Sequence, residues 1–377
     1  MGNVPMIDTY TKGATLGNVP MIDIKDLSKV ELEDALEEMG AERYRARQIW
    51  RWLYKSGVRS FDEMTDIPKP LCKELKRAFH ISNLALLDSK RSLLDGTTKY
   101  LVKLEDGNQI EAVYLPEAGR ATACLSSQVG CKFRCAFCAS AEFGFIRNLT
   151  VSEILDEVIF IKSKNPSSPL TNLVFMGIGE PLDNYDNVIR AIRILNDRDA
   201  FGIGARKITI STCGIIPGIK RLAGEGLQVE LSVSLHSADD GLRSKLIPIN
   251  KTYPLKELMA ASKEYIKLTN RIITFECVLV KNVNSSREDA LKLAALLKGV
   301  KCKVNTIAYN QANPAFVYKG GVKAEGYEPP ANDEIRLFIA TLKKHSIHVM
   351  HRKSKGGEID AGCGQLKAYR GRKSNHG

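Results

Sequence analysis

The stretch "TVSEILDEVIFIKSKNPSSPLTNLVFMGIGEP", from Thr150 to Pro181, holds one copy of the unit that much of the chain repeats. Thr150 and Glu153 have the spacing of a capping box, which predicts a helix over "VSEILDEVIFIK". The apolar run "TNLVFMG" then predicts a buried strand, and a glycine-rich polar group follows it directly. A helix that leads into a buried strand is typical of parallel α/β proteins.

The same alternation continues on both sides of this stretch. The strand "RATACLSS" precedes it, and four more apolar strands follow, namely "RKITIST", "VELSVSL", "IITFECVLV" and "KVNTIAY". The helical stretches that separate or follow them include "YDNVIRAIRIL", "PLKELMAASKEYI", "SREDALKLAALLK" and "NDEIRLFIATLKK". About six such units predict an α/β fold with helices outside a parallel sheet, either a partial barrel or a doubly wound sheet.

Other patterns precede this alternation. The stretches "SKVELEDALEEMG" and "AERYRARQIWRWLYKSG" predict a small helical domain. An Asp-Gly pair between "TTKYLVKL" and "QIEAVYLP" predicts a β-hairpin. The segment "GNVPMID" occurs twice near the start, which indicates a duplicated, disordered tail. We expect five segments: the tail at 1–23, a helical accessory domain at 24–95, a hairpin linker at 96–123, the α/β core at 124–366 and a basic tail at 367–377.

The chain is basic, with a formal net charge of +12. This charge indicates a polyanionic partner, nucleic acid first, although a solvated basic surface gives the same balance. The N-terminus lacks the pattern of a signal peptide and no apolar run is long enough to span a bilayer, so we expect a cytoplasmic protein without membrane contact.

Four of the nine cysteines lie between Cys124 and Cys138. Cys131, Cys135 and Cys138 have the spacing C-x3-C-x2-C, and in a reducing cytoplasm such a cluster binds metal more often than it forms disulfides. A structural zinc site needs four ligands, whereas a cubane iron–sulfur cluster on three thiolates keeps one iron open for another ligand. Spacing favours iron–sulfur, with zinc or plain buried thiols as the alternatives.

Most of the predicted strands end in polar or glycine-rich groups. These groups are Gly179-Glu180-Pro181, Ser211-Thr212-Cys213-Gly214, Ser234-Leu235-His236-Ser237 and Tyr309-Asn310. In parallel α/β proteins, ligands bind at the carboxyl ends of the strands, so the four groups together predict one small-molecule site. None has the spacing of a dinucleotide or ATP phosphate loop.

The ordered set "SSQVGCKFRCAFCAS", "GIGEP", "ISTCG", "SVSLHS" and "EIDAGCGQL" resembles the RlmN/Cfr family of radical S-adenosylmethionine (SAM) RNA methyltransferases over most of the chain. The resemblance implies a partial (β/α)6 barrel behind a small helical domain that contacts RNA. It also implies a [4Fe–4S] cluster on Cys131, Cys135 and Cys138, with SAM on the fourth iron. SAM would be held by Gly179, Glu180, Ser211, Ser234, Leu235, His236 and Asn310.

By the same resemblance, Cys363 carries an S-methylcysteine intermediate, Glu111 accepts a proton and Cys124 resolves the product through a transient disulfide with Cys363. The implied reaction methylates C2 of an adenine in 23S rRNA and consumes two SAM per turnover. It leaves open tRNA as a second substrate. The implied partners are the RNA and an electron donor such as flavodoxin, and we expect a monomer.

Three other functions compete with this one. Methylation of C8 of the adenine, which confers antibiotic resistance, uses the same residues in the same family. A zinc-stabilised RNA-binding protein would need the cysteines but have no use for Cys363 or Glu111. A radical SAM activase or small-molecule enzyme would keep the cluster but leave the basic helical domain unexplained.

Overall fold

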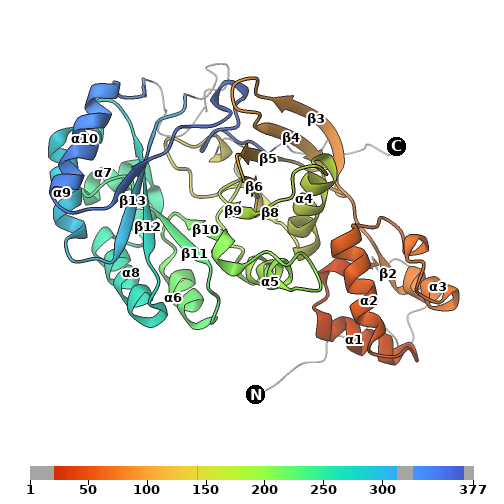
Figure 1. Ribbon diagram of the computed structural model, residues 1–377. Helices are drawn as coiled ribbons and strands as arrows, with labels where there is room; N and C mark the ends of the chain where they lie inside the picture. The colour runs from red at the N-terminus through yellow and green to blue at the C-terminus, as the bar shows by residue number, and fades with distance from the viewer. Residues whose placement is uncertain (1–20, 142, 312–325, 369–377) are drawn as a thin grey trace, which may run out of the picture.

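The computed structural model describes residues 21–141, 143–311 and 326–368 (Figure 1). A curved sheet surrounded by helices forms a partial (β/α)6 barrel, and a small helical domain lies to one side of it. This settles the choice left open by the sequence in favour of the barrel. Nearly all of the predicted N-terminal tail, and the basic tail after residue 368, lie outside the described residues.

One ten-stranded sheet organises the molecule, in the order β14-β13-β12-β11-β10-β9-β6-β5-β4-β3. Its barrel part is parallel, as predicted, and consists of β6 (Arg120–Cys124), β9 (Asn172–Phe175), β10 (Ile208–Thr212), β11 (Glu230–Ser234), β12 (Ile273–Leu279), β13 (Cys302–Ala308) and β14 (Val349–His351). The order follows the chain because each helical crossover returns the chain to the next position in the sheet.

The helices on the outside of the barrel are α4 (Val151–Lys164), α5 (Tyr185–Asn196), α6 (Ile216–Gly224), α7 (Asp240–Leu246), α8 (Leu255–Thr269), α9 (Arg287–Leu297) and α10 (Asn332–Lys344). The predicted capping box of α4 is present, since Thr150 Oγ1 accepts from the Glu153 amide at 3.2 Å and the Glu153 carboxylate accepts from the Thr150 amide at 3.0 Å. Within the described ranges, no helix is long and apolar enough to cross a membrane.

The predicted hairpin is part of the same sheet. β4 (Thr98–Lys103) and β5 (Gln109–Glu117) pair around the turn at Asp106-Gly107, and β5 pairs antiparallel with β6, with Val113 opposite Cys124. A further strand, β3 (Ala85–Arg91), forms the edge of the sheet. The hairpin therefore extends the barrel wall and carries Glu111 beside it.

The helical domain contains α1 (Lys29–Glu38), α2 (Arg45–Arg51) and α3 (Lys69–Ala78), with β1 (Ile22–Asp23) paired to β2 (Phe79–His80). A buried ionic group joins it to the barrel. Lys25 contacts the Asp156 carboxylate of α4 and donates to the Ser82 carbonyl at 2.7 Å. Breaking a buried pair from one side leaves an uncompensated charge, so this contact fixes the domain against α4.

Candidate active site

The three clustered cysteines lie on the loop between β7 (Gln128–Gly130) and β8 (Phe145–Asn148), which pair antiparallel at the base of the loop. Gly130 has a φ of +78°, and a Cβ there would lie 1.7 Å from the Gly144 carbonyl oxygen, so only glycine fits this crossing. The loop returns close to its own start, and its three cysteines line the wall of one cavity of about 160 Å3.

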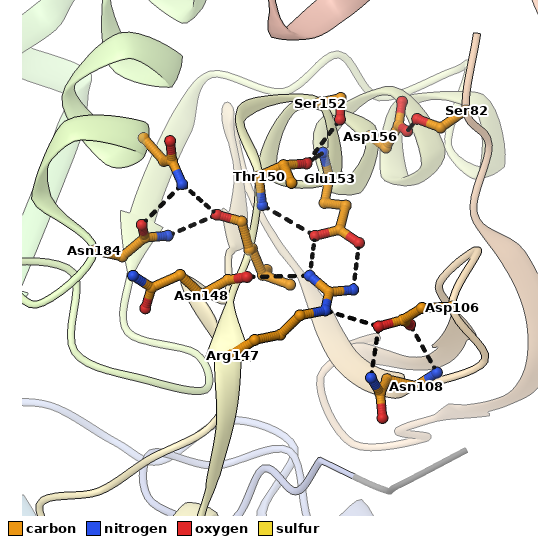
Figure 2. Close-up of polar contacts among 12 residues, drawn as sticks. Ser82, Asp106, Asn108, Arg147, Asn148, Thr150, Ser152, Glu153, Asp156 and Asn184 are labelled. Carbon is orange, nitrogen blue, oxygen red and sulfur yellow. Dashed lines mark hydrogen bonds and ion pairs between the residues drawn. The ribbon is translucent and has the colours of Figure 1, made fainter. Parts of the chain in front are cut away.

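Arg147 on β8 fixes the base of this loop (Figure 2). Its guanidinium donates two parallel hydrogen bonds of 2.7 Å to the Glu153 carboxylate at the start of α4. Its Nε donates at 2.7 Å to Asp106 in the β4–β5 turn. One side chain thus ties the cysteine loop to the hairpin and to the first barrel helix.

We expect Arg147→Met to lower the free energy of unfolding by about 2 kcal/mol, because charge-assisted hydrogen bonds of a partly buried group are lost. We also expect less iron per chain after anaerobic reconstitution, since the loop loses its anchor. Calorimetry and iron analysis measure the two effects. Arg221→Met removes an exposed pair with Asp186 and serves as the control; equal effects of the two substitutions would contradict the anchoring role.

The loop after β9 forms the next wall of the cavity. The Glu180 carboxylate is buried and accepts from the Cys213 amide at 2.7 Å and the Leu182 amide at 3.0 Å. The Glu180 amide donates to Gln128 Oε1 at 2.9 Å, which links this loop to β7. Gly179 has a φ of +100°, and a Cβ there would lie 2.6 Å from Gln128 Cβ, so a close approach of the two backbones fixes the glycine.

His236, after β11, offers a donor to the cavity. Its Nδ1 accepts from the Val278 amide at 2.9 Å, which places the proton of the neutral ring on Nε2. Burial, with a smaller contribution from Arg243, lowers the pKa of His236 to about 3, so the ring is neutral. Nε2 is buried without a hydrogen-bond partner among the described residues, and the ring lies against Phe137 at 4.4 Å between centroids. An orphaned donor in a cavity wall fits a ligand with an acceptor.

A buried guanidinium lies near Cys135 of the cysteine loop. Arg243 is fully buried and donates to the carbonyl oxygens of Cys213 at 2.8 Å and Ser234 at 3.1 Å. Burial lowers the pKa of Arg243 to about 10, and the nearby thiols of Cys213 and Cys135 oppose this. A fixed cation in this place favours thiolates, as an iron–sulfur cluster requires.

Burial raises the pKa of all three thiols of the loop, that of Cys131 to about 12, and so disfavours the thiolates that a cluster binds. Cys138 raises the pKa of both Cys131 and Cys135, and Cys131 raises that of Cys135, which reflects their proximity. Across the described part of the chain, no three His, Cys, Asp or Glu side chains form a group that holds a single metal ion. Three thiols on the wall of one cavity, with a guanidinium near one of them, fit the cubane cluster predicted from their spacing.

A second and larger cavity, of about 530 Å3, adjoins the first. Five residues line both, namely Met176, Glu276, Ile307, Arg352 and Cys363. Cys124, at the end of β6, lines only the second. Burial raises the pKa of Cys124, and the neighbouring Cys363 raises it further, which places the two thiols near each other. Cys363 therefore lies at the junction of the cysteine-lined cavity and a roomier chamber.

The loop that carries Cys363 is fastened to the cysteine loop. The Ala139 amide donates to the Gly364 carbonyl at 2.7 Å, and Ser140 Oγ donates to the Leu366 carbonyl at 2.8 Å. Asn310 Nδ2 donates to the Cys363 carbonyl at 3.2 Å. Surrounding protein raises the pKa of Cys363 although the residue is exposed to the cavity, and the Arg352 guanidinium lowers it. The three contacts orient the thiol between the two cavities.

Glu111 lies apart from both cavities. Its side chain is 6% exposed; the Lys99 ammonium lies 3.1 Å from Oε1, and Oε2 accepts from the Lys367 amide at 2.8 Å. Burial raises the pKa of Glu111, and Lys99 opposes this. The backbone at residue 367 thus covers the carboxylate.

The sequence-predicted residues fall into two groups in the structure. The first cavity is lined by Cys131, Cys135, Cys138, Gly179, Glu180, Ser211, Ser234, His236 and Cys363. Outside its lining are Leu235, which is in the core, Asn310, which contacts the Cys363 carbonyl, Cys124, which lines the second chamber, and Glu111.

Four residues of the site were not found from the sequence: Arg243, Glu276, Arg352 and Lys99. Glu276 had a signal, because it is the single charge within the apolar strand "IITFECVLV". Its carboxylate accepts from Asn305 Nδ2 at 3.0 Å, and burial raises its pKa. The other three are ordinary surface-type cations in the sequence, and only the fold turns them inward.

Known proteins share this arrangement. Residues 125–294 match the Radical SAM superfamily, and residues 22–81 match the ribosomal RNA large subunit methyltransferase N-terminal domain. A probable dual-specificity RNA methyltransferase RlmN from Thermoanaerobacter sp. is 44% identical over 92% of this chain and 98% of its own. One from Thermotoga maritima is 43% identical over 93% of this chain and 98% of its own.

A solved structure extends the likeness to three dimensions. The crystal structure of a radical SAM methyltransferase from Sphaerobacter thermophilus has 40% identity and a TM-score of 0.85, and the match covers 92% of this chain and 99% of that chain. These similarities span both the helical domain and the barrel. The chain therefore belongs to the RlmN/Cfr family of radical SAM RNA methyltransferases, within which it is most like RlmN.

Proposed function

We propose that this enzyme methylates C2 of an adenine in 23S rRNA through a methyl group carried on Cys363. The observation that carries the proposal is the place of Cys363, at the junction of the cysteine-lined cavity and a second chamber that also holds Cys124. A carrier between a cofactor site and a substrate site needs such a position. The names of the relatives extend the proposal to tRNA as a second substrate.

Cys131, Cys135 and Cys138 would hold a [4Fe–4S] cluster, and the polar loops after β9, β10 and β11 would hold SAM. When bound there, the cluster and SAM would supply radical chemistry, and Cys363 would present the hydrogen atoms of its methyl group to it. His236 Nε2, which has no partner among the described residues, would donate a hydrogen bond that orients SAM. Leu235 would contribute its backbone, since its side chain lies in the core, and Asn310 would act through the Cys363 loop.

Residues of the chain accept the methyl group, hold the adenine, take up the proton and release the product. Arg352 favours the thiolate of Cys363, which accepts the methyl group. The second chamber holds the adenine, which is joined through the methylene carbon to Cys363. Glu111 accepts the proton that leaves C2, and the one electron left on the adenine by the radical addition would return to the iron–sulfur cluster. Cys124 attacks Cys363 Sγ, so that an S–S bond forms, the S–CH2 bond breaks and the carbon left on the adenine takes a proton.

The proposal includes the surroundings of the enzyme. The net charge of +12 suits an RNA partner. An electron donor of the flavodoxin type would supply the reducing equivalent to a monomeric enzyme in the cytoplasm. The proposal divides the chain into the same five segments, with residues 24–95 as an RNA-contacting domain in front of the catalytic core at 124–366; the end of the first of these, β3, joins the sheet of the barrel.

The test is nucleoside mass spectrometry of ribosomal RNA incubated anaerobically with reconstituted enzyme, SAM and a reductant. We expect 2-methyladenosine with the intact enzyme and none with Cys363→Ala, because the methyl carrier is lost. The appearance of 8-methyladenosine would replace the proposal by C8 methylation. Cleavage of SAM without any methyladenosine would overturn the RNA assignment, and a colourless zinc-bound protein would overturn the radical chemistry.

A further inference from the structure

Leu93 and Leu94 form an apolar tip that nothing in the described part of the chain covers. Leu93 is 99% exposed and Leu94 is 84% exposed, in the turn between β3 and β4. Single exposed leucines are ordinary, but two in succession at the end of a hairpin present apolar surface to a partner. The tip takes part in none of the chemistry proposed above.

The turn is rigid. The amides of Leu94 and Asp95 both donate to Ser92 Oγ at 3.2 Å, and the Thr97 amide donates to the Asp95 carboxylate at 2.9 Å. Ser92 also contacts the Glu358 carboxylate. A preorganised apolar tip loses little conformational entropy when it binds, which suits insertion into another surface.

The turn that carries the tip lies beside the C-terminal segment of the chain (Figure 1, where the brown turn meets the dark-blue segment). Asp95 accepts from the Gly356 amide at 2.9 Å, and the next residue back, Lys355, lines the chamber. A Cβ at Gly96 would lie 3.3 Å from Pro116 Cγ, and both neighbours of Pro116 line the chamber. The turn that carries the tip therefore packs against two segments that line the chamber.

The charge beside the tip selects the partner. Lys90 and Arg91 are exposed on β3, and their side chains form no ion pair or hydrogen bond within the described ranges. Lys303, Arg120 and Lys353 line the chamber itself. An apolar wedge with cations on the adjoining strand, beside a chamber that is itself lined by cations, fits a nucleic acid, since cations bind phosphates and apolar wedges enter base steps.

We propose that Leu93 and Leu94 insert into the substrate RNA beside the target adenine and occupy the space that the adenine leaves when it enters the chamber. This inference rests on the proposed function. Chemistry on a base requires its removal from the stack, and a side chain that fills the gap lowers the cost of unstacking. Lys90 and Arg91 hold the adjoining phosphates.

The test compares Leu93→Ser/Leu94→Ser with wild-type enzyme on a 23S rRNA fragment that contains the adenine methylated by the wild type. We expect KM for the RNA to rise by at least about ten-fold, since two leucines lose their burial. With 2-aminopurine next to the target, the fluorescence increase on binding should be lost. Cys363 self-methylation and thermal stability should stay unchanged. Lys90→Gln/Arg91→Gln should make the dependence of binding on salt shallower.

Leu268→Ser/Leu337→Ser, on the outer helices α8 and α10, removes exposed leucines away from the tip and serves as the control. Wild-type KM and fluorescence in the tip variant would overturn the inference. Lower stability or self-methylation would also overturn it, because the tip would then pack on its own chain. If the wild type forms no methyladenosine, the proposed function fails instead, which separates the two results.

Discussion

Replacement of Cys124 by alanine is expected to leave RNA covalently attached to the enzyme through Cys363. The substitution removes the thiol that breaks the S–CH2 bond, while the cysteine loop and Cys363 keep their surroundings. Cys124 is the one cysteine that lines the second chamber beside Cys363 in the described structure, so no other thiol stands in for it there. We expect multiple turnover to be lost almost completely and one equivalent of RNA to migrate with the protein on a denaturing gel.

The surroundings of Cys124 favour its thiol form in the resting enzyme. Burial raises the pKa of Cys124, and the neighbouring Cys363 raises it further. In the adduct, Cys363 is a thioether without charge, so its contribution is absent while burial remains. The pKa of Cys124 should therefore be lower in the adduct than in the resting enzyme.

The matched control is Cys277→Ala. Cys277 is buried on β12, and its truncation leaves a cavity of similar size without touching either chamber wall described above. We expect this variant to turn over normally and to carry no RNA. Normal turnover by Cys124→Ala, or an adduct that also forms with Cys363→Ala, would show that the two cysteines do not have these roles.

The sequence predicted most of the barrel because buried parallel strands and amphipathic helices have distinct periodicities. The strands from "RATACLSS" to "KVNTIAY" and the helix over 332–344 were found in place. β3 was missed because every one of its residues is exposed, so it has no alternation. α6 was missed because its first turn contains Pro217 and Gly218, which usually interrupt a helix.

The candidate site was predictable only where chemistry and spacing coincide on a short segment. The three clustered cysteines and the groups after β9, β10 and β11 met this condition and line one cavity. Arg352 did not, because nothing in "HVMHRKS" tells an inward cation from a surface one until β14 joins the sheet. The hydrogen bond from the Lys367 amide to Glu111 was likewise not predictable, because the two residues are far apart in the sequence.

Glu111→Gln is expected to lower the rate of methyladenosine formation by about 10^2- to 10^4-fold, the usual contribution of a positioned general base. Glutamine has the same shape and still accepts from the Lys367 amide, but it takes no proton from C2. Methylation of Cys363 precedes this step and should be unchanged. Single-turnover assays that follow both products separate the two.

The pH dependence of the rate gives a second test of the role of Glu111. Burial raises the pKa of Glu111, with Lys99 opposing, so the acid limb of the wild-type pH–rate profile should lie above the ordinary glutamate range. A base must be deprotonated, so activity falls as the pH drops through that raised value. Lys99→Met removes the opposing cation and should move the limb to still higher pH.

Glu157→Gln provides the control for a buried carboxylate, since Glu157 accepts from the Ser126 amide at 3.0 Å and lines neither chamber. It should keep the wild-type rate and pH profile. Because the Lys367 amide covers Glu111 in the structure, proton transfer requires residues 365–368 to move from the carboxylate while the adenine is bound. Wild-type turnover by the Glu111→Gln enzyme would show that another group accepts the proton. Glu276 would then be the candidate, because its carboxylate lines both cavities and acts electrostatically on Cys363.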